Sequence, residues 1–140
     1  AVAGIDTSRF PVEGVTWEQA MEFCDRLNRT TDLASQHALT CRLPTSAEWE
    51  FAARAGTTTR FWTGDSEQDA KEAGWLQSNS WDPTTQAARM HAVGQLRANP
   101  FGLFDVLGNA WELVQDGWDP TYYEQLPNMP VVDCVILAKG

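Results

Sequence analysis

The stretch Asn99–Asp119, NPFGLFDVLGNAWELVQDGWD, is the most informative part of this 140-residue chain. Its glycines, aromatic side chains and carboxylates follow one another too closely for an amphipathic helix or an alternating strand. We therefore expect an irregular, tightly packed turn region here. The segments that precede it are expected to support it.

Two earlier segments have the pattern of amphipathic helices. Each begins with a capping box, in which Thr16 is followed by Gln19 and Thr45 by Glu48. Apolar residues then recur at helical spacing, and Gly56 supplies a left-handed stop for the second helix. The expected buried positions are Trp17, Ala20, Met21, Cys24 and Leu27 in the first helix, and Trp49, Ala52 and Ala53 in the second.

Regular patterns are scarce in the rest of the chain. Apolar residues alternate over 39–43, which predicts a short strand that Pro44 ends. Residues 56–94 have the composition of long packed loops, which need large side chains to attach them to a core. The expected anchors are Trp62, Trp75 and Trp81.

The charge balance limits the classes of partner. The formal net charge is −9, with no clustered basic face, which argues against a nucleic-acid partner. A cation or a divalent metal suits this balance better, although carboxylates are also the ordinary solvated surface of a protein. No run is long and apolar enough to cross a membrane, and no targeting segment is visible. We therefore expect a soluble protein, with the cytoplasm as the default compartment.

The cysteines do not form a recognisable framework. Cys24, Cys41 and Cys134 cannot all pair within the chain, and none has metal-ligand spacing. Cys24 lies on the apolar face of the first helix, so a buried core residue is favoured over a reactive thiol. His37 and His91 are assigned no role.

Several segments together resemble the sulfatase-modifying-factor family, the formylglycine-generating enzymes and their relatives. The resemblance implies an α+β, loop-rich, C-type-lectin-like fold with two helices, short twisted strands and long irregular segments. We expect residues 1–140 to form a single domain that lacks the family's opening strands and its C-terminal catalytic part. The matching segments are PVEGVTWEQAMEFCDRLN, CRLPTSAEWEFAARAGT, FWTGD, HAVGQ, NPFGLFDVLGNAWELVQD and DPTYYEQLP.

The resemblance also implies an activity. The family oxidises a cysteine of a sulfatase segment to formylglycine, using copper held by two cysteines that follow a GGSW-type motif. This chain stops about where that motif would begin, and Cys134 stands alone before it. We therefore expect no catalytic residues, no copper and no oxidase activity in this form, so its status as an enzyme stays open.

Two other roles remain open. The chain could be a non-catalytic protein that binds a peptide or small molecule, or acts as a scaffold, through its tryptophan-rich loops. We also expect a homo-oligomer, most simply a two-fold dimer, with VVDCVIL, residues 131–137, in or near the interface, because that run would be an uncovered edge.

The resemblance further implies a calcium site in DVLGNAWE. Its ligands would be the side chains of Asp105 and Glu112 and the main-chain carbonyls of Gly108 and Ala110. Calcium takes such mixtures of oxygen ligands. The alternative is a tight turn in which the two carboxylates accept from backbone donors. A second family site uses an Asn where this chain has Gly74, so we expect that site to be absent or altered.

Overall fold

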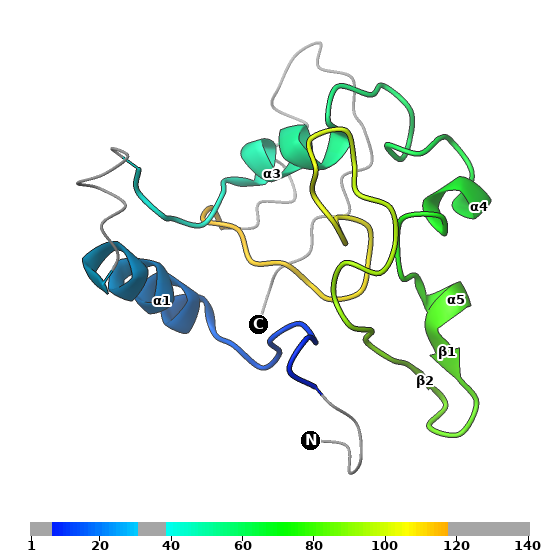
Figure 1. Ribbon diagram of the computed structural model, residues 1–140, viewed down its shortest axis with the longest axis horizontal. Helices are drawn as coiled ribbons and strands as arrows, with labels where there is room; N and C mark the ends of the chain where they lie inside the picture. The colour runs from blue at the N-terminus through cyan, green and yellow to red at the C-terminus, as the bar shows by residue number, and fades with distance from the viewer. Residues whose placement is uncertain (1–6, 31–38, 118–140) are drawn as a thin grey trace. The chain divides into compact units, whose positions relative to one another are not determined.

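The computed structural model describes residues 7–30 and 39–117, which form short helices, one small hairpin and long irregular segments (Figure 1). No described helix has both the length and the apolar character needed to cross a lipid bilayer. In chain order the elements are α1 (Trp17–Thr30), α3 (Ser46–Arg54), α4 (Glu67–Ala70), α5 (Gln77–Ser80), β1 (Trp81–Asp82) and β2 (Ala87–Ala88).

The chain divides into two compact units. The first contains Glu50–Trp111 and the described residues up to Glu13, and the second contains the described residues of Gly14–Trp49 and those from Glu112 onward. The boundary therefore falls within α3. The expectation of a single domain over residues 1–140 stays a prediction.

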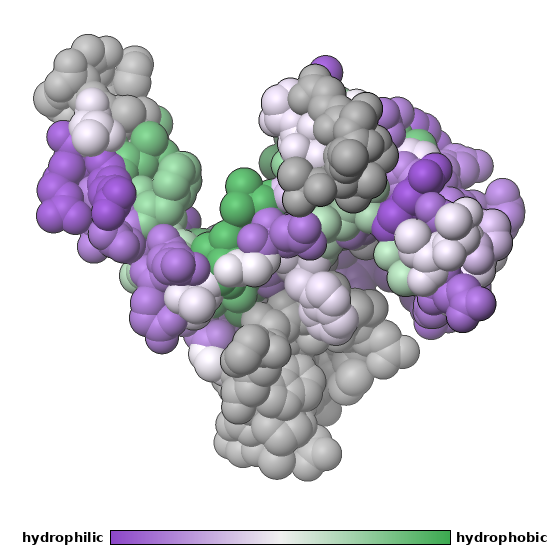
Figure 2. Space-filling model, turned by 90° about the horizontal axis from the view of Figure 1, so that it is seen from below, coloured by the Kyte–Doolittle hydropathy of each residue, from purple (hydrophilic) through white to green (hydrophobic). Residues whose placement is uncertain are grey.

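Both expected helices form, and both begin as the capping boxes predict. The Thr16 Oγ1 accepts from the Gln19 amide at 3.2 Å, and the Gln19 side chain accepts from the Thr16 amide at 2.8 Å. Because each partner satisfies a donor that the first turn leaves open, α1 has a defined start. Figure 2 shows α1 with hydrophilic residues on one side and hydrophobic residues on the other, as expected for an amphipathic helix.

The predicted strand at residues 39–43 is wrong. The Cys41 amide donates to the Asn28 Oδ1 at 2.7 Å, and the Cys41 carbonyl accepts from the Asn28 Nδ2 at 2.8 Å. A side chain thus takes the backbone groups that a strand neighbour would use, and the segment is irregular. The short helices α4 and α5 were not expected from the sequence.

The first unit has a core of small residues around one tryptophan. Its fully or nearly buried apolar residues include Ala53, Trp62, Ala70, Ala73 and Val106. Trp62 is therefore an anchor, as predicted. The same prediction is wrong for Trp81, which lies in β1 and is 50% exposed, because the two-residue hairpin is too small to cover an indole.

Two backbone segments of the first unit touch where glycines allow it. A Cβ on Gly74 would lie 2.2 Å from the Leu107 carbonyl oxygen, and one on Gly108 would lie 2.2 Å from the Trp75 carbonyl oxygen. Gly108 also has a φ of 80°, which favours glycine. The contact includes a hydrogen bond from the Asn109 amide to the Trp75 carbonyl at 2.9 Å. This approach fixes the turn after Leu107.

Asn99 attaches the start of the informative stretch to α3. Its side-chain nitrogen donates to the carbonyls of Ala52 and Ala53 at 2.7 and 3.1 Å, and its Oδ1 accepts from the amides of Phe101 and Leu103, each at 3.0 Å. The carbonyls belong to the last turn of α3, which lacks helical partners for them. Asn99 is only 4% exposed, so water cannot replace these bonds.

Asn99→Ala should lower the free energy of unfolding by about 2–4 kcal/mol, because it leaves several buried backbone groups without partners. Urea unfolding measures the change. Gln77→Ala removes an amide at an exposed position and should cost less than about 0.5 kcal/mol. Equal losses in the two variants would contradict the structural role of Asn99.

Candidate functional site

Three polar arrangements surround the informative stretch, and the first is the turn that contains the predicted calcium ligands. Asp105, Gly108 and Asn109 have φ angles of 57°, 80° and 65°, so the chain reverses through left-handed residues here. Asparagine and aspartate tolerate this conformation better than other residues with side chains. The turn therefore follows from the residue types.

Asp105 is the most unusual residue of this turn. Its Oδ2 accepts from the Gly94 amide at 2.7 Å, as the alternative of a tight turn predicted. Its Oδ1 is buried and has no hydrogen-bond partner within the described chain. A carboxylate oxygen without a partner away from water is costly, and a cation would remove that cost.

The other predicted ligands are placed differently. Gly108 and Ala110 lie in the same turn as Asp105, and the Gly108 carbonyl accepts from the Ala110 amide at 2.9 Å. Glu112 belongs to the second unit, where its carboxylate accepts a hydrogen bond from the indole of Trp49. Within the described residues, no three His, Cys, Asp or Glu side chains gather as a metal-binding group. A calcium ion would therefore depend on carbonyl oxygens in addition to Asp105.

The second arrangement consists of Asn109, His91 and Trp75, and it supports this turn. The Asn109 side chain accepts from the His91 amide at 2.9 Å and donates to the His91 carbonyl at 3.2 Å. The imidazole stacks on Trp75 with ring centres 3.7 Å apart and planes 12° from parallel. Burial lowers the pKa of His91, so the ring is favoured in its neutral form. His91 is thus a packing residue of the turn.

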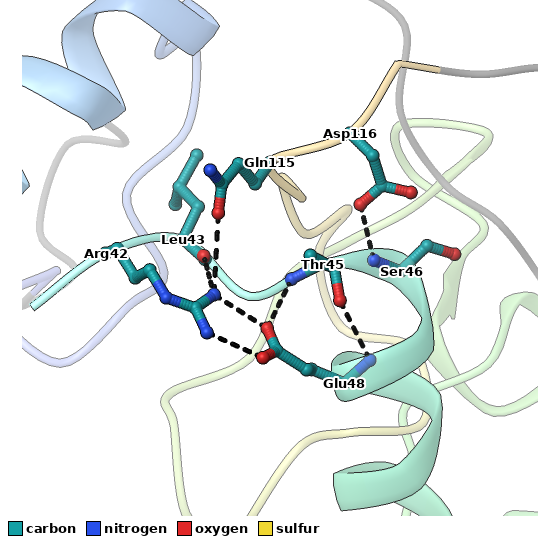
Figure 3. Close-up of polar contacts among 7 residues, drawn as sticks. All are labelled: Arg42, Leu43, Thr45, Ser46, Glu48, Gln115 and Asp116. Atoms are coloured by element: carbon teal, nitrogen blue, oxygen red, sulfur yellow. Dashed lines mark hydrogen bonds and ion pairs between the residues drawn. The ribbon is translucent and has the colours of Figure 1, made fainter.

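The third arrangement lies in the second unit, at the N-terminus of α3 (Figure 3). The Arg42 guanidinium binds both carboxylate oxygens of Glu48, at 2.6 and 2.7 Å. Glu48 also completes the capping box by accepting from the Thr45 amide at 2.8 Å, while its own amide donates to the Thr45 hydroxyl at 3.2 Å. One carboxylate therefore both caps the helix and pairs with an arginine.

Residues 112–116 close this cluster. The Asp116 carboxylate accepts from the Ser46 amide at 2.6 Å (Figure 3). The Gln115 amide donates to the Pro44 carbonyl at 2.8 Å. A carboxylate at a helix N-terminus also interacts favourably with the helix dipole. The sequence pattern predicts the Glu48 cap but not the roles of Arg42, Gln115 and Asp116, because contacts in this cluster join residues up to 73 positions apart along the chain.

The Arg42 pair predicts a specific acid response. Hydrogen bonding to Arg42 lowers the pKa of Glu48 from its ordinary value of 4.5 to about 2. On acidification the unfolded chain binds this proton first, so the stability contributed by Glu48 is present above pH 4.5 and is lost as the pH falls towards 2.

We therefore expect the difference in melting temperature between the wild type and Glu48→Gln to shrink as the pH falls from 4.5 to 2. Arg42→Met should also weaken the pH dependence, because the carboxylate keeps only its cap. Thermal melts across this pH range measure both effects. A difference that stays constant with pH would show that the charge of Glu48 contributes nothing. The pair is about half exposed, so the effect should decrease in high salt.

Comparison with known proteins identifies the family. The chain is 44% identical over 107 residues to a formylglycine-generating enzyme of Mycobacterium tuberculosis, covering 71% of this chain and 35% of that protein. It is 32% identical over 117 residues to the serine/threonine-protein kinase pkn1 of Chlamydia caviae, covering 84% of this chain and 15% of that protein. The chain thus spans about a third or less of these relatives.

A solved structure agrees with this assignment. Treponema denticola variable protein 1 superposes with a TM-score of 0.60 at 27% identity, covering 84% of this chain and 55% of that one. This likeness supports the expected loop-rich α+β fold. The model of the sulfatase-modifying factor enzyme 1-like domain matches residues 4–140. The chain therefore belongs to the family of formylglycine-generating enzymes and sulfatase-modifying factors.

Proposed function

We propose that this chain forms a calcium-stabilised scaffold within a protein of the formylglycine-generating type. The observation that carries the proposal is the buried Oδ1 of Asp105, which has no partner in the described chain. Asp105 lies in a turn whose carbonyl-bearing residues are held close by backbone contact with Trp75. Calcium would give this oxygen a positively charged partner.

Within the first unit, the residues that would hold the ion are Asp105, through a carboxylate oxygen, and Gly108 and Ala110, through their main-chain carbonyls. Glu112, the fourth ligand that the resemblance implies, belongs to the second unit. Calcium accepts this mixture and tolerates irregular geometry. The Oδ2 of Asp105 already accepts from Gly94, which orients the carboxylate and leaves Oδ1 available.

Addition of millimolar calcium should raise the melting temperature of the wild type, because a ligand that binds only the native state stabilises it. Asp105→Asn should abolish this rise, since an amide is a weaker ligand for calcium. Asp25→Asn is a control with the same charge change on the exposed face of α1 and should keep the rise. An unchanged melting temperature in the wild type at all calcium concentrations would rule out the site.

We infer that the 140 residues do not by themselves oxidise a cysteine to formylglycine. The resemblance implies copper held by a cysteine pair that follows a GGSW-type motif, and the 140-residue sequence contains no such motif with a cysteine pair after it. Cys24 lies in the middle of α1 and is buried, where a large peptide substrate could not reach it. The chain as it stands would therefore contribute structure to the family's reaction without performing it.

Incubation with copper(I), oxygen and a cysteine-containing sulfatase peptide should yield no aldehyde. A hydrazide reagent followed by mass spectrometry detects formylglycine sensitively. A formylglycine-generating enzyme with its complete domain is the positive control. Aldehyde formed by this chain would overturn the inference and restore oxidase activity as the leading function.

A second candidate is a non-catalytic binding or scaffold protein that acts as a homodimer. Apolar side chains that remain at the surface favour it (Figure 2). In the first unit, Phe51 is 68% exposed and its ring centre lies 5.6 Å from that of Phe101, which is 52% exposed. Such paired aromatic rings are efficient contact material. The run 131–137, also proposed for the interface, lies outside the described residues.

Light scattering at micromolar concentration should then give the mass of a dimer. If the first unit contributes to the interface, Phe101→Ser should shift the protein towards the monomer. The matched control is Phe23→Ser, which replaces an exposed phenylalanine of the second unit and should leave the dimer unchanged. A monomer mass for the wild type would exclude the homodimer.

A further inference from the structure

Cys24 and Cys41 both belong to the second unit and are 17 positions apart along the chain. Cys24 is in α1 and 6% exposed, and Cys41 lies in the irregular segment before α3 and is half-buried. Both thiols are free. Neither has the spacing of a known motif, so only the fold brings them together.

Asn28 fixes this arrangement. It follows Cys24 by four residues, so the two side chains lie on the same face of α1, one turn apart. The Asn28 amide holds the Cys41 backbone on both sides, with bonds of 2.7 Å to its N–H and 2.8 Å to its carbonyl. Cys41 is therefore clamped beside the helix face that carries Cys24.

The electrostatics of the pair agree with this geometry. Burial raises the pKa of the Cys24 thiol, and interaction with the Cys41 thiol raises it further. Cys24 is buried and Cys41 is half-buried, so Cys41 is the more accessible of the two.

We propose that Cys24 and Cys41 form a redox-sensitive pair, which is oxidised reversibly to a disulfide that links α1 to the segment before α3. This site is independent of the calcium proposal and of the oxidation of a sulfatase substrate. It assigns a reaction to Cys24, for which the sequence favoured a purely structural role. The oxidant is a low-molecular-weight disulfide.

The reaction proceeds by two exchanges. The Cys41 thiolate, the more accessible nucleophile, attacks one sulfur of the small disulfide and releases one small thiol. Cys24 then loses its proton to solvent, attacks the Sγ of Cys41 and releases the second small thiol. In total, two protein thiols are oxidised to one disulfide, and one small disulfide is reduced to two thiols.

The link would have a structural effect. It would close the loop from residue 24 to residue 41 and so restrict the unfolded chain. It would also fix the residue that precedes Arg42, whose guanidinium holds the Glu48 cap of α3. Oxidation would therefore stabilise the start of α3.

The test uses Cys134→Ser protein, in which Cys24 and Cys41 are the only thiols. Titration with oxidised glutathione under native conditions should abolish alkylation of both thiols and lower the intact mass by about 2 Da, without a glutathione adduct. Trypsin should then release residues 10–26 linked to residues 30–42. The melting temperature should rise by about 5–10 °C and return after reduction with dithiothreitol.

Single variants in the same background test the order of attack. With Cys24→Ser, Cys41 should keep a stable glutathione adduct, because no second thiol can displace it. With Cys41→Ser, buried Cys24 should react at least tenfold more slowly. Retention of two free thiols, stable adducts on both cysteines or disulfide-linked dimers in the Cys134→Ser protein would each overturn the proposal. The alkylation, mass and melting measurements on the Cys134→Ser protein need no substitution at position 24 or 41. They therefore test the proposal even if a variant at either position fails to fold.

Discussion

Hydrogen bonds from asparagine side chains to the backbone order the irregular segments within each unit. The described strands are only two residues long, so most backbone donors and acceptors cannot find partners in a sheet. A carboxamide carries both N–H donors and a C=O acceptor, the same kinds of group as a peptide, and can therefore replace a strand neighbour. Four asparagines each bind backbone N–H and C=O groups in this way: Asn28, Asn79, Asn99 and Asn109.

Helix α3 shows what these bonds achieve. Asn99 binds carbonyls in its last turn, and Asp116 binds an amide in its first turn, so the informative stretch attaches to both ends of one helix. Each contact lies within one unit. Because a helix leaves its terminal backbone groups unpaired, its two ends are the natural places for an irregular segment to attach. The long loops thus gain order without a large sheet.

Both candidate sites are supported by an asparagine side chain that binds the backbone. The turn that contains Asp105 is held by Asn109 and by the contact between Gly108 and Trp75, and this rigidity leaves one carboxylate oxygen buried without a partner. The pair of Cys24 and Cys41 is likewise set by Asn28. In both cases an asparagine fixes the backbone and thereby places a reactive or charged group beside it.

The sequence by itself determined the family, the positions of α1 and α3, and their capping boxes. These depend on short-range patterns, since a threonine and a carboxylate or carboxamide three residues apart meet in any helix that they start. The irregular character of the turn at 105–110 also followed from its residue types.

Only the tertiary structure decided how distant segments meet. It replaced the predicted strand at 39–43 with the Asn28 clamp, which holds Cys41 beside α1, left Trp81 half exposed and placed Asp116 on α3. An asparagine in the sequence gives no sign of which backbone segment it will bind, because its amide can pair with any peptide group that the fold brings near. Those contacts depend on chain reversals at positions distant in the sequence. They therefore exist only once the molecule has folded.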